Sequence, residues 1–217
     1  MKFHIIDREN WGRKLYFEHY LKLKCTFSVT ANIDITKLLK QLRKKEIKLY
    51  PAFIYMVSRT VNAHKEFRTC FNNEDVLGYW DKMIPSYTIF HNDTKSFSSI
   101  WTEFSNEFSI FYQNYQDDRK QYGDVKGFFT KENIPPNSFP ISSIPWVSFT
   151  SFNLNINNDN NFLLPIITGG KYFNQENKIF LPISLQAHHA VCDGYHASMF
   201  IEELQELVNN CHDWLYE

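Results

Sequence analysis

The segment from Lys178 to Asn209 joins an apolar strand to an amphipathic helix through a very short connection. Residues 178–188 form an apolar run of strand length, and residues 195–209 carry apolar side chains at steps of three and four. A strand of this kind needs a sheet, and the helix needs an apolar surface to cover. The helix face consists of Ala197, Phe200, Ile201, Leu204, Leu207 and Val208.

The rest of the chain also mixes strand-period and helix-period segments. We expect further strands over residues 27–35, 76–80, 86–91, 146–156 and 163–173, with a turn joining the second to the third. We expect helices over residues 38–45, from Pro51 onward, and around residues 104–115. Residues 122–145 hold six Gly and Pro residues and should be largely irregular. With no repeat and no linker, the chain is predicted to be one domain, residues 1–217, an α+β or α/β two-layer sandwich.

Charge and cysteine spacing exclude several classes of protein. The 23 Lys and Arg residues balance 24 Asp and Glu residues, so there is no basic footprint for nucleic acid or an anionic membrane surface. No apolar run reaches the roughly 18–20 residues of a membrane span. The four cysteines lie far apart, which argues against a thiolate zinc site or a disulfide framework. We therefore expect a soluble cytoplasmic protein.

The strand-to-helix connection, HHAVCDGYH from His188 to His196, is the strongest candidate for chemistry. A neutral histidine can act as a general base near pH 7, and a strand end can project it into a cleft. Asp193 can cap the helix or pair with a cation. Two other readings are buried structural histidines and a metal site of His188, His189, Asp193 and His196. Adjacent strand residues face opposite sides, so His188 and His189 converge on one ion only with difficulty.

The same stretch resembles the active-site signature of the chloramphenicol acetyltransferase family. Shorter HHxxxDG motifs also occur in dihydrolipoyl acyltransferases, condensation domains and plant-type acyltransferases. Four further segments are similar to this family in the expected order and cover essentially the whole chain. They are NWGRKLYFEHY (10–20), KLYPAFIY (48–55), ISSIPWVSFTSFNLN (141–155) and PIITGGKY (165–172).

The resemblance implies a homotrimer, with a mixed sheet covered by helices on one face in each subunit and active sites at the subunit interfaces. It implies that His189 is the catalytic base and that Ser142 hydrogen-bonds the oxyanion. It also implies a structural ion pair between Asp193 and Arg13, and a water held near the oxyanion by Thr168.

The activity implied by the resemblance is transfer of an acetyl group from acetyl-CoA to the primary hydroxyl of chloramphenicol, which inactivates the antibiotic, with no metal. Similarity to family positions that bind the acceptor or the coenzyme extends to eight residues. Those for the acceptor are Tyr20, Phe27, Phe97, Phe129 and Leu154, and those for coenzyme A are Trp146, Tyr172 and Lys171.

Several alternatives stay open at the level of sequence. Cys192 could be a nucleophile, but the neighbouring Asp193 tends to raise its thiol pKa, so a packing role is favoured. A related CoA-dependent acyltransferase could use another hydroxyl or thiol acceptor. A non-catalytic trimeric binder of an aromatic ligand, or a metal-dependent hydrolase, would belong to a different class.

Overall fold

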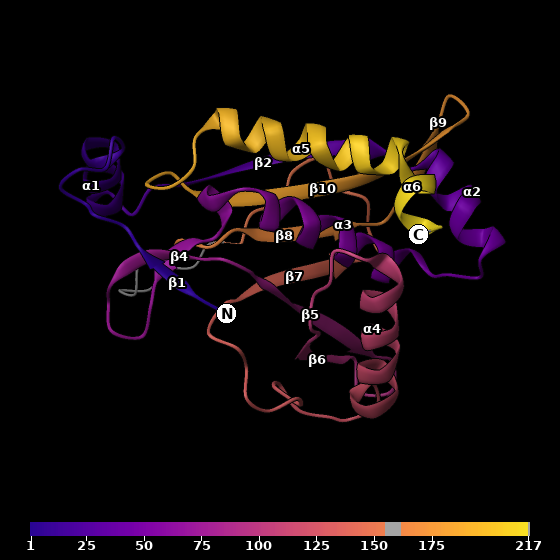
Figure 1. The fold of residues 1–217 in the computed structure, drawn as a ribbon. Coiled ribbons are helices and arrows are strands. Elements are labelled where there is room, and N and C mark those ends of the chain that lie inside the picture. Colours follow the sequence, from indigo (N-terminus) through magenta and orange to yellow (C-terminus); the bar gives the residue numbers. More distant parts are fainter. Residues whose placement is uncertain (155–161, 217) are drawn as a thin grey trace.

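The computed structural model describes residues 1–154 and 162–216, and a mixed sheet forms its centre (Figure 1). Within these residues the seven-stranded sheet has the order β2-β10-β8-β7-β5-β6, and β9 pairs with β10. The pairs β5–β7 and β7–β8 are parallel and the others antiparallel. The strand bounds are β2 (Thr26–Asp34), β5 (Ile84–His91), β6 (Ser96–Trp101), β7 (Ser138–Ile144), β8 (Ile166–Gly170), β9 (Phe173–Gln175) and β10 (Lys178–His188).

A second, three-stranded sheet has the order β1-β4-β3 and lies near the N-terminal helix (Figure 1). Its strands are β1 (Phe3–Ile5), β3 (Thr69–Phe71) and β4 (Leu77–Trp80). The strands expected over residues 76–80 and 86–91 therefore belong to different sheets and do not form a hairpin. Each finds its partners elsewhere, β4 in β1 and β3, and β5 in β6 and β7.

Helices supply the second layer of the fold. The strand β10 is followed by α5 (Gly194–Asn209), which runs alongside β2 and β10 with α3 (Leu49–Ala63) beside it (Figure 1). Both helices bury apolar side chains in the core, such as Tyr55 of α3 and Phe200 of α5, and the core also contains Phe111 and Trp214. The other helices are α1 (Lys14–Lys22), α2 (Thr36–Lys44), η1 (Lys65–Phe67), α4 (Phe108–Tyr122) and α6 (Cys211–Leu215). The predicted α+β class with a mixed sheet and helices is confirmed.

Of two expectations about the segment before β8, the irregular stretch holds for residues 123–137 but not for residues 138–144, and the strand over residues 146–156 is wrong for its described part. Residues 138–144 form β7 although they contain Pro140. The chain tolerates this proline because β8 pairs with β7 only from Ile141 onward, so Pro140 has a neighbouring strand on one side alone. Residues 146–154 form no strand; the predicted residues 155 and 156 lie outside the described part of the chain.

Side chains of β10 hold the segment that follows β7. The hydroxyl of Ser184 donates to the carbonyl of Phe152 at 2.7 Å, and Gln186 Oε1 accepts the N–H of Leu154 at 2.9 Å. Ser184 and Gln186 alternate with the core residues Ile183 and Leu185, so they point to the face opposite the core. The segment therefore covers that face with side-chain hydrogen bonds instead of joining the sheet as a strand.

Two smaller boundaries also differ. The expected strand over residues 163–173 is shorter, since β8 ends at Gly170 and β9 starts at Phe173. The aromatic helix begins at Phe108, after the expected Phe104, and continues to Tyr122. No helix among the described residues is both long and apolar enough to cross a membrane.

Candidate functional site

A tight turn after β10 presents the histidine pair. The N–H of His189 donates to the carbonyl of Cys25 at 2.8 Å, which continues the pairing with the start of β2. The carbonyl of His188 accepts the N–H groups of Val191 and Cys192, each at 3.1 Å. The ring Nδ1 of His188 accepts the N–H of Ala190 at 3.1 Å, and burial lowers the pKa of this ring. His188 is thus a neutral part of the turn.

Arg13, immediately before α1, clamps the same turn. Its guanidinium donates to both carboxylate oxygens of Asp193 at 2.6 Å. It also donates to the carbonyl of His189 at 2.8 Å and to that of Ala190 at 2.7 Å. The hydrogen bonds from Arg13 lower the pKa of Asp193, and those to Asp193 raise the pKa of Arg13. The pair that the resemblance implied is therefore present in the geometry.

The ring of His189 is fixed in one orientation. Its Nδ1 lies 3.1 Å from the carbonyl oxygen of Cys192 and 3.2 Å from Oδ1 of Asp193. Both neighbours are acceptors, so we assign the proton of the neutral ring to Nδ1, which leaves the lone pair on Nε2. Tyr20 stacks on the ring, with centroids 3.8 Å apart and planes at 6°, and Phe27 lies edge-on at 5.3 Å. This arrangement can accept a proton at Nε2.

The other chemistry considered for this turn receives less support. Cys192 is 1% exposed, its thiol contacts the carbonyl of Glu66 at 3.6 Å, and burial raises its pKa. A thiol of this kind is a poor nucleophile because little thiolate forms. Among the described residues, no three His, Cys, Asp or Glu side chains are grouped as metal ligands would be.

Ser142 and Thr168 lie next to each other on β7 and β8, but away from His189 of the same chain. Thr168 pairs with Ser142 on one side and with Ser184 of β10 on the other. His189 is five residues beyond Ser184, which at about 3.3 Å per residue is roughly 16 Å along the strand. One chain therefore does not bring Ser142 into contact with His189.

The residues predicted to bind the acceptor also fall into two groups, one beside His189 and one away from it. Tyr20 and Phe27 contact His189, whereas Phe97 and Phe129 meet at the far side of the sheet, beyond β5, through Phe128. Phe128 is 5.8 Å from Phe97 and 4.3 Å from Phe129 between ring centroids. Sequence reasoning missed Phe128, although it is adjacent to Phe129. Phe97, Phe128, Phe129 and Leu154 are 47–58% exposed in the single chain.

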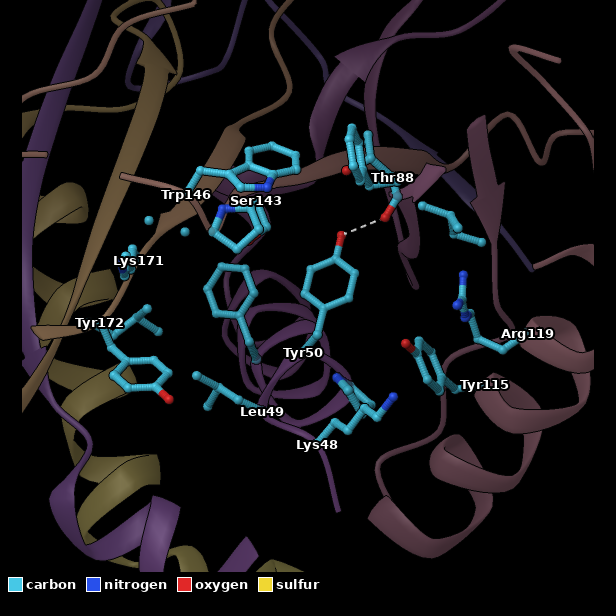
Figure 2. A pocket seen from close by; sticks show the side chains of 18 residues that line it. Lys48, Leu49, Tyr50, Thr88, Tyr115, Arg119, Ser143, Trp146, Lys171 and Tyr172 are labelled. Atoms are coloured by element: carbon cyan, nitrogen blue, oxygen red, sulfur yellow. Dashed lines mark hydrogen bonds between the residues drawn. The ribbon is translucent and has the colours of Figure 1, made fainter. Parts of the chain in front are cut away.

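A pocket of about 390 Å³ gathers the three residues predicted to contact coenzyme A. Figure 2 shows Trp146, Lys171 and Tyr172 on one side and Arg119 with Tyr115 across from them. The start of α3 lies between these two sides, and its Tyr50 hydroxyl donates to the carbonyl of Thr88 at 3.1 Å.

The pocket is suited to an anionic ligand with apolar parts. Lys48, Arg119 and Lys171 line it, with no carboxylate among the described lining residues. Lys48, the N-cap of α3, makes no side-chain capping hydrogen bond. The first-turn N–H groups of a helix lack partners within the helix and favour anions. The KLYPAFIY resemblance was the available signal for Lys48 and Tyr50, and nothing in the sequence pointed to Arg119.

Comparisons with known proteins agree with one another. The family model described as chloramphenicol acetyltransferase matches residues 1–205. A chloramphenicol acetyltransferase of Clostridium butyricum is 59% identical over 99% of both chains. One of Clostridium perfringens is 58% identical over 100% of both chains, and one of Staphylococcus aureus is 52% identical over 99% of this chain and 100% of the relative.

Solved structures share the fold at low identity. A chloramphenicol acetyltransferase superposes with a TM-score of 0.81 at 21% identity, covering 95% of this chain and 100% of the other. The dihydrolipoamide acetyltransferase of Azotobacter vinelandii superposes with a TM-score of 0.65 at 15% identity, covering 93% of this chain and 88% of the other.

Proposed function

Since the chain belongs to the chloramphenicol acetyltransferase family and is an acetyltransferase acting on chloramphenicol, we propose that His189 is the general base of the transfer and acetyl-CoA the donor. The observation that carries this assignment is the ring orientation of His189. Its Nδ1 faces two acceptors, so Nε2 is the atom free to take a proton. The stacked Tyr20 holds the ring plane.

The reaction follows from this geometry. Nε2 of His189 removes the proton of the acceptor hydroxyl while its oxygen attacks the thioester carbonyl carbon. The tetrahedral oxyanion then accepts a hydrogen bond from the hydroxyl of Ser142, with Thr168 holding a nearby water. When the carbon–sulfur bond breaks, the imidazolium gives its proton to the departing CoA thiolate. General base catalysis contributes about 10²–10⁴-fold, and one oxyanion donor about 10²–10³-fold.

We propose that a neighbouring copy of the chain supplies Ser142 to His189, and that three copies form a homotrimer. The roughly 16 Å offset along the strand supports this, because Ser142 of the same chain lies too far away. The exposed aromatic residues Phe97 and Phe129 support it as well. A partner that presents Tyr20, Phe27 and His189 to these residues and to Leu154 would complete an aromatic acceptor site.

We assign the donor to the pocket beside α3. Trp146 and Tyr172 offer apolar surface to the pantetheine and adenine groups, and Lys171 and Lys48 offer positive charge to the phosphates. We also propose that residues 1–217 form a single domain that works in the cytoplasm. The four free cysteines fit a reducing compartment.

The experiment that tests the base is thiol release from acetyl-CoA with and without chloramphenicol. We expect chloramphenicol-dependent release from the wild type and a loss of at least about 100-fold for His189→Ala. The control is His212→Ala, which removes a histidine on α6, away from the site. If His189→Ala kept wild-type turnover, the base assignment would be wrong.

A further inference from the structure

A largely buried ion pair links the long loop between α4 and β7 to α4 itself, and its lysine also contacts the end of β6. Lys131 Nζ lies 2.6 Å from Oδ1 of Asp118, and both side chains are 14% exposed. The same ammonium donates to the carbonyl of Trp101 at 3.1 Å and lies 3.8 Å from the centroid of the Trp101 ring. The carboxylate also accepts the hydroxyl of Thr102 at 2.7 Å. The proposed acetyl transfer makes no use of this pair.

The pair lies next to the aromatic residues of the acceptor site. Ser99, two residues before Trp101, forms a bridge to Phe129, and its N–H donates to the carbonyl of Phe128 at 2.6 Å. On the other side of Lys131, the carbonyl of Glu132 accepts the indole N–H of Trp101 at 3.2 Å. Lys131 is thus the charged link in a row of contacts that fixes the loop against β6.

We propose that Lys131 and Asp118 are positioning residues for the chloramphenicol site, acting through Phe128 and Phe129. This inference rests on the proposed acceptor role of Phe97 and Phe129. Burying an ion pair costs desolvation free energy, and this pair offsets it with several short hydrogen bonds and a cation–π contact. The loop has no helix or regular strand between Gly123 and Asn137 in the described structure, so these side-chain contacts add to the few backbone bonds that Ser99 makes with it. Figure 1 shows it running from α4 to β7.

The test compares Lys131→Met with Lys126→Met in the same loop. Lys126 pairs with Asp93 at 2.8 Å, but these side chains are 44% and 66% exposed, and such pairs contribute little. We expect Lys131→Met to raise the KM for chloramphenicol roughly tenfold, equivalent to about 1.4 kcal/mol of binding. The KM for acetyl-CoA should stay within about twofold of the wild type, because Asp118, Trp101 and Tyr122, which Lys131 contacts, do not line the donor pocket. Lys126→Met should change neither constant.

A double variant separates an effect of Lys131 on chloramphenicol binding from its effect on the stability of the fold. Lys131→Met alone leaves the Asp118 charge half-satisfied and should lower the melting temperature. Adding Asp118→Asn removes that charge and keeps an acceptor for Thr102, so the melting temperature should recover in part while the KM for chloramphenicol stays raised.

Three outcomes would overturn the inference. They are a chloramphenicol KM for Lys131→Met that equals that of Lys126→Met, an equal rise in both KM values, and a chloramphenicol KM that returns to normal with the melting temperature in the double variant. Absence of chloramphenicol turnover in the wild type would instead contradict the function itself.

Discussion

Arg13 uses its guanidinium to hold the single turn that presents His189. Its four hydrogen bonds reach the Asp193 carboxylate and the carbonyls of His189 and Ala190. The resemblance implied the ion pair with Asp193 but not the two carbonyl contacts. Backbone contacts of this kind depend on the path of the turn, which residue types do not encode.

Replacing Arg13 by Met should therefore reduce both stability and activity. We expect a loss of about 3 kcal/mol in the free energy of unfolding, the low end for a broken buried pair, because the Asp193 side chain is 39% exposed. Lys14→Met is the matched control, since Lys14 forms an exposed pair with Glu9 that should contribute under about 1 kcal/mol. Denaturant unfolding measures both. Equal effects of the two variants would contradict the clamp role.

The stability lost in Arg13→Met should also depend on pH. The pKa of Asp193 is lowered from 3.8 in the native state, chiefly by Arg13. A carboxylate with a lowered native pKa stabilises the fold above its unfolded pKa, and this contribution is lost as the pH falls through the native value. The difference in stability between wild type and Arg13→Met should therefore shrink below about pH 4.

Elements with a clear hydrophobic period were predictable from the sequence, and those set by tertiary contacts were not. The strand β10 and the helix α5 match their expected ranges within a residue or two because burial on the sheet governs both patterns. β7 was not predicted because a proline usually interrupts a strand. Pro140 is tolerated because only β5, and not β8, pairs with β7 at this position. The sequence of residues 146–154 predicted a strand, but side chains of β10 bind the carbonyl of Phe152 and the N–H of Leu154 instead.

Hydrogen bonds from β10 side chains thus take the place of strand pairing in this segment, and a change at Gln186 tests their contribution. In Gln186→Leu the N–H of Leu154 loses its acceptor. Leu154 is 47% exposed, so water can replace the lost bond, and we expect a cost of only about 1 kcal/mol. Hydrogen exchange at the Leu154 amide should accelerate while that of the β2–β10 ladder stays slow. Gln113→Leu, which removes an exposed side-chain bond on α4, is the control.

At the scale of the whole molecule, the expectation that the site lies between subunits came from the resemblance alone. Periodicity shows which side chains are apolar, but it does not show which exposed surfaces of separate copies meet. The structure adds a physical reason, since one chain holds His189 and Ser142 on well-separated parts of the same sheet. It also leaves Leu15, Tyr16 and Leu23 exposed in and just after α1, which lies at one end of the molecule (Figure 1).

A mixing experiment tests this arrangement. His189→Ala and Ser142→Ala chains should each be nearly inactive alone, by about 10²-fold or more. When the two are unfolded together and refolded in equal amounts, every mixed trimer contains one interface at which an intact His189 meets an intact Ser142. Random assembly makes three quarters of the trimers mixed, so about a quarter of the sites should be restored.

Thiol release then decides between the two arrangements. Recovery to about a quarter of the wild-type rate would mean that the two residues come from different chains. If both came from one chain, each chain would lack one of them, and the refolded mixture would stay as inactive as its parts. Mixing the folded variants without unfolding is the control, because stable trimers should exchange chains slowly and show no early recovery.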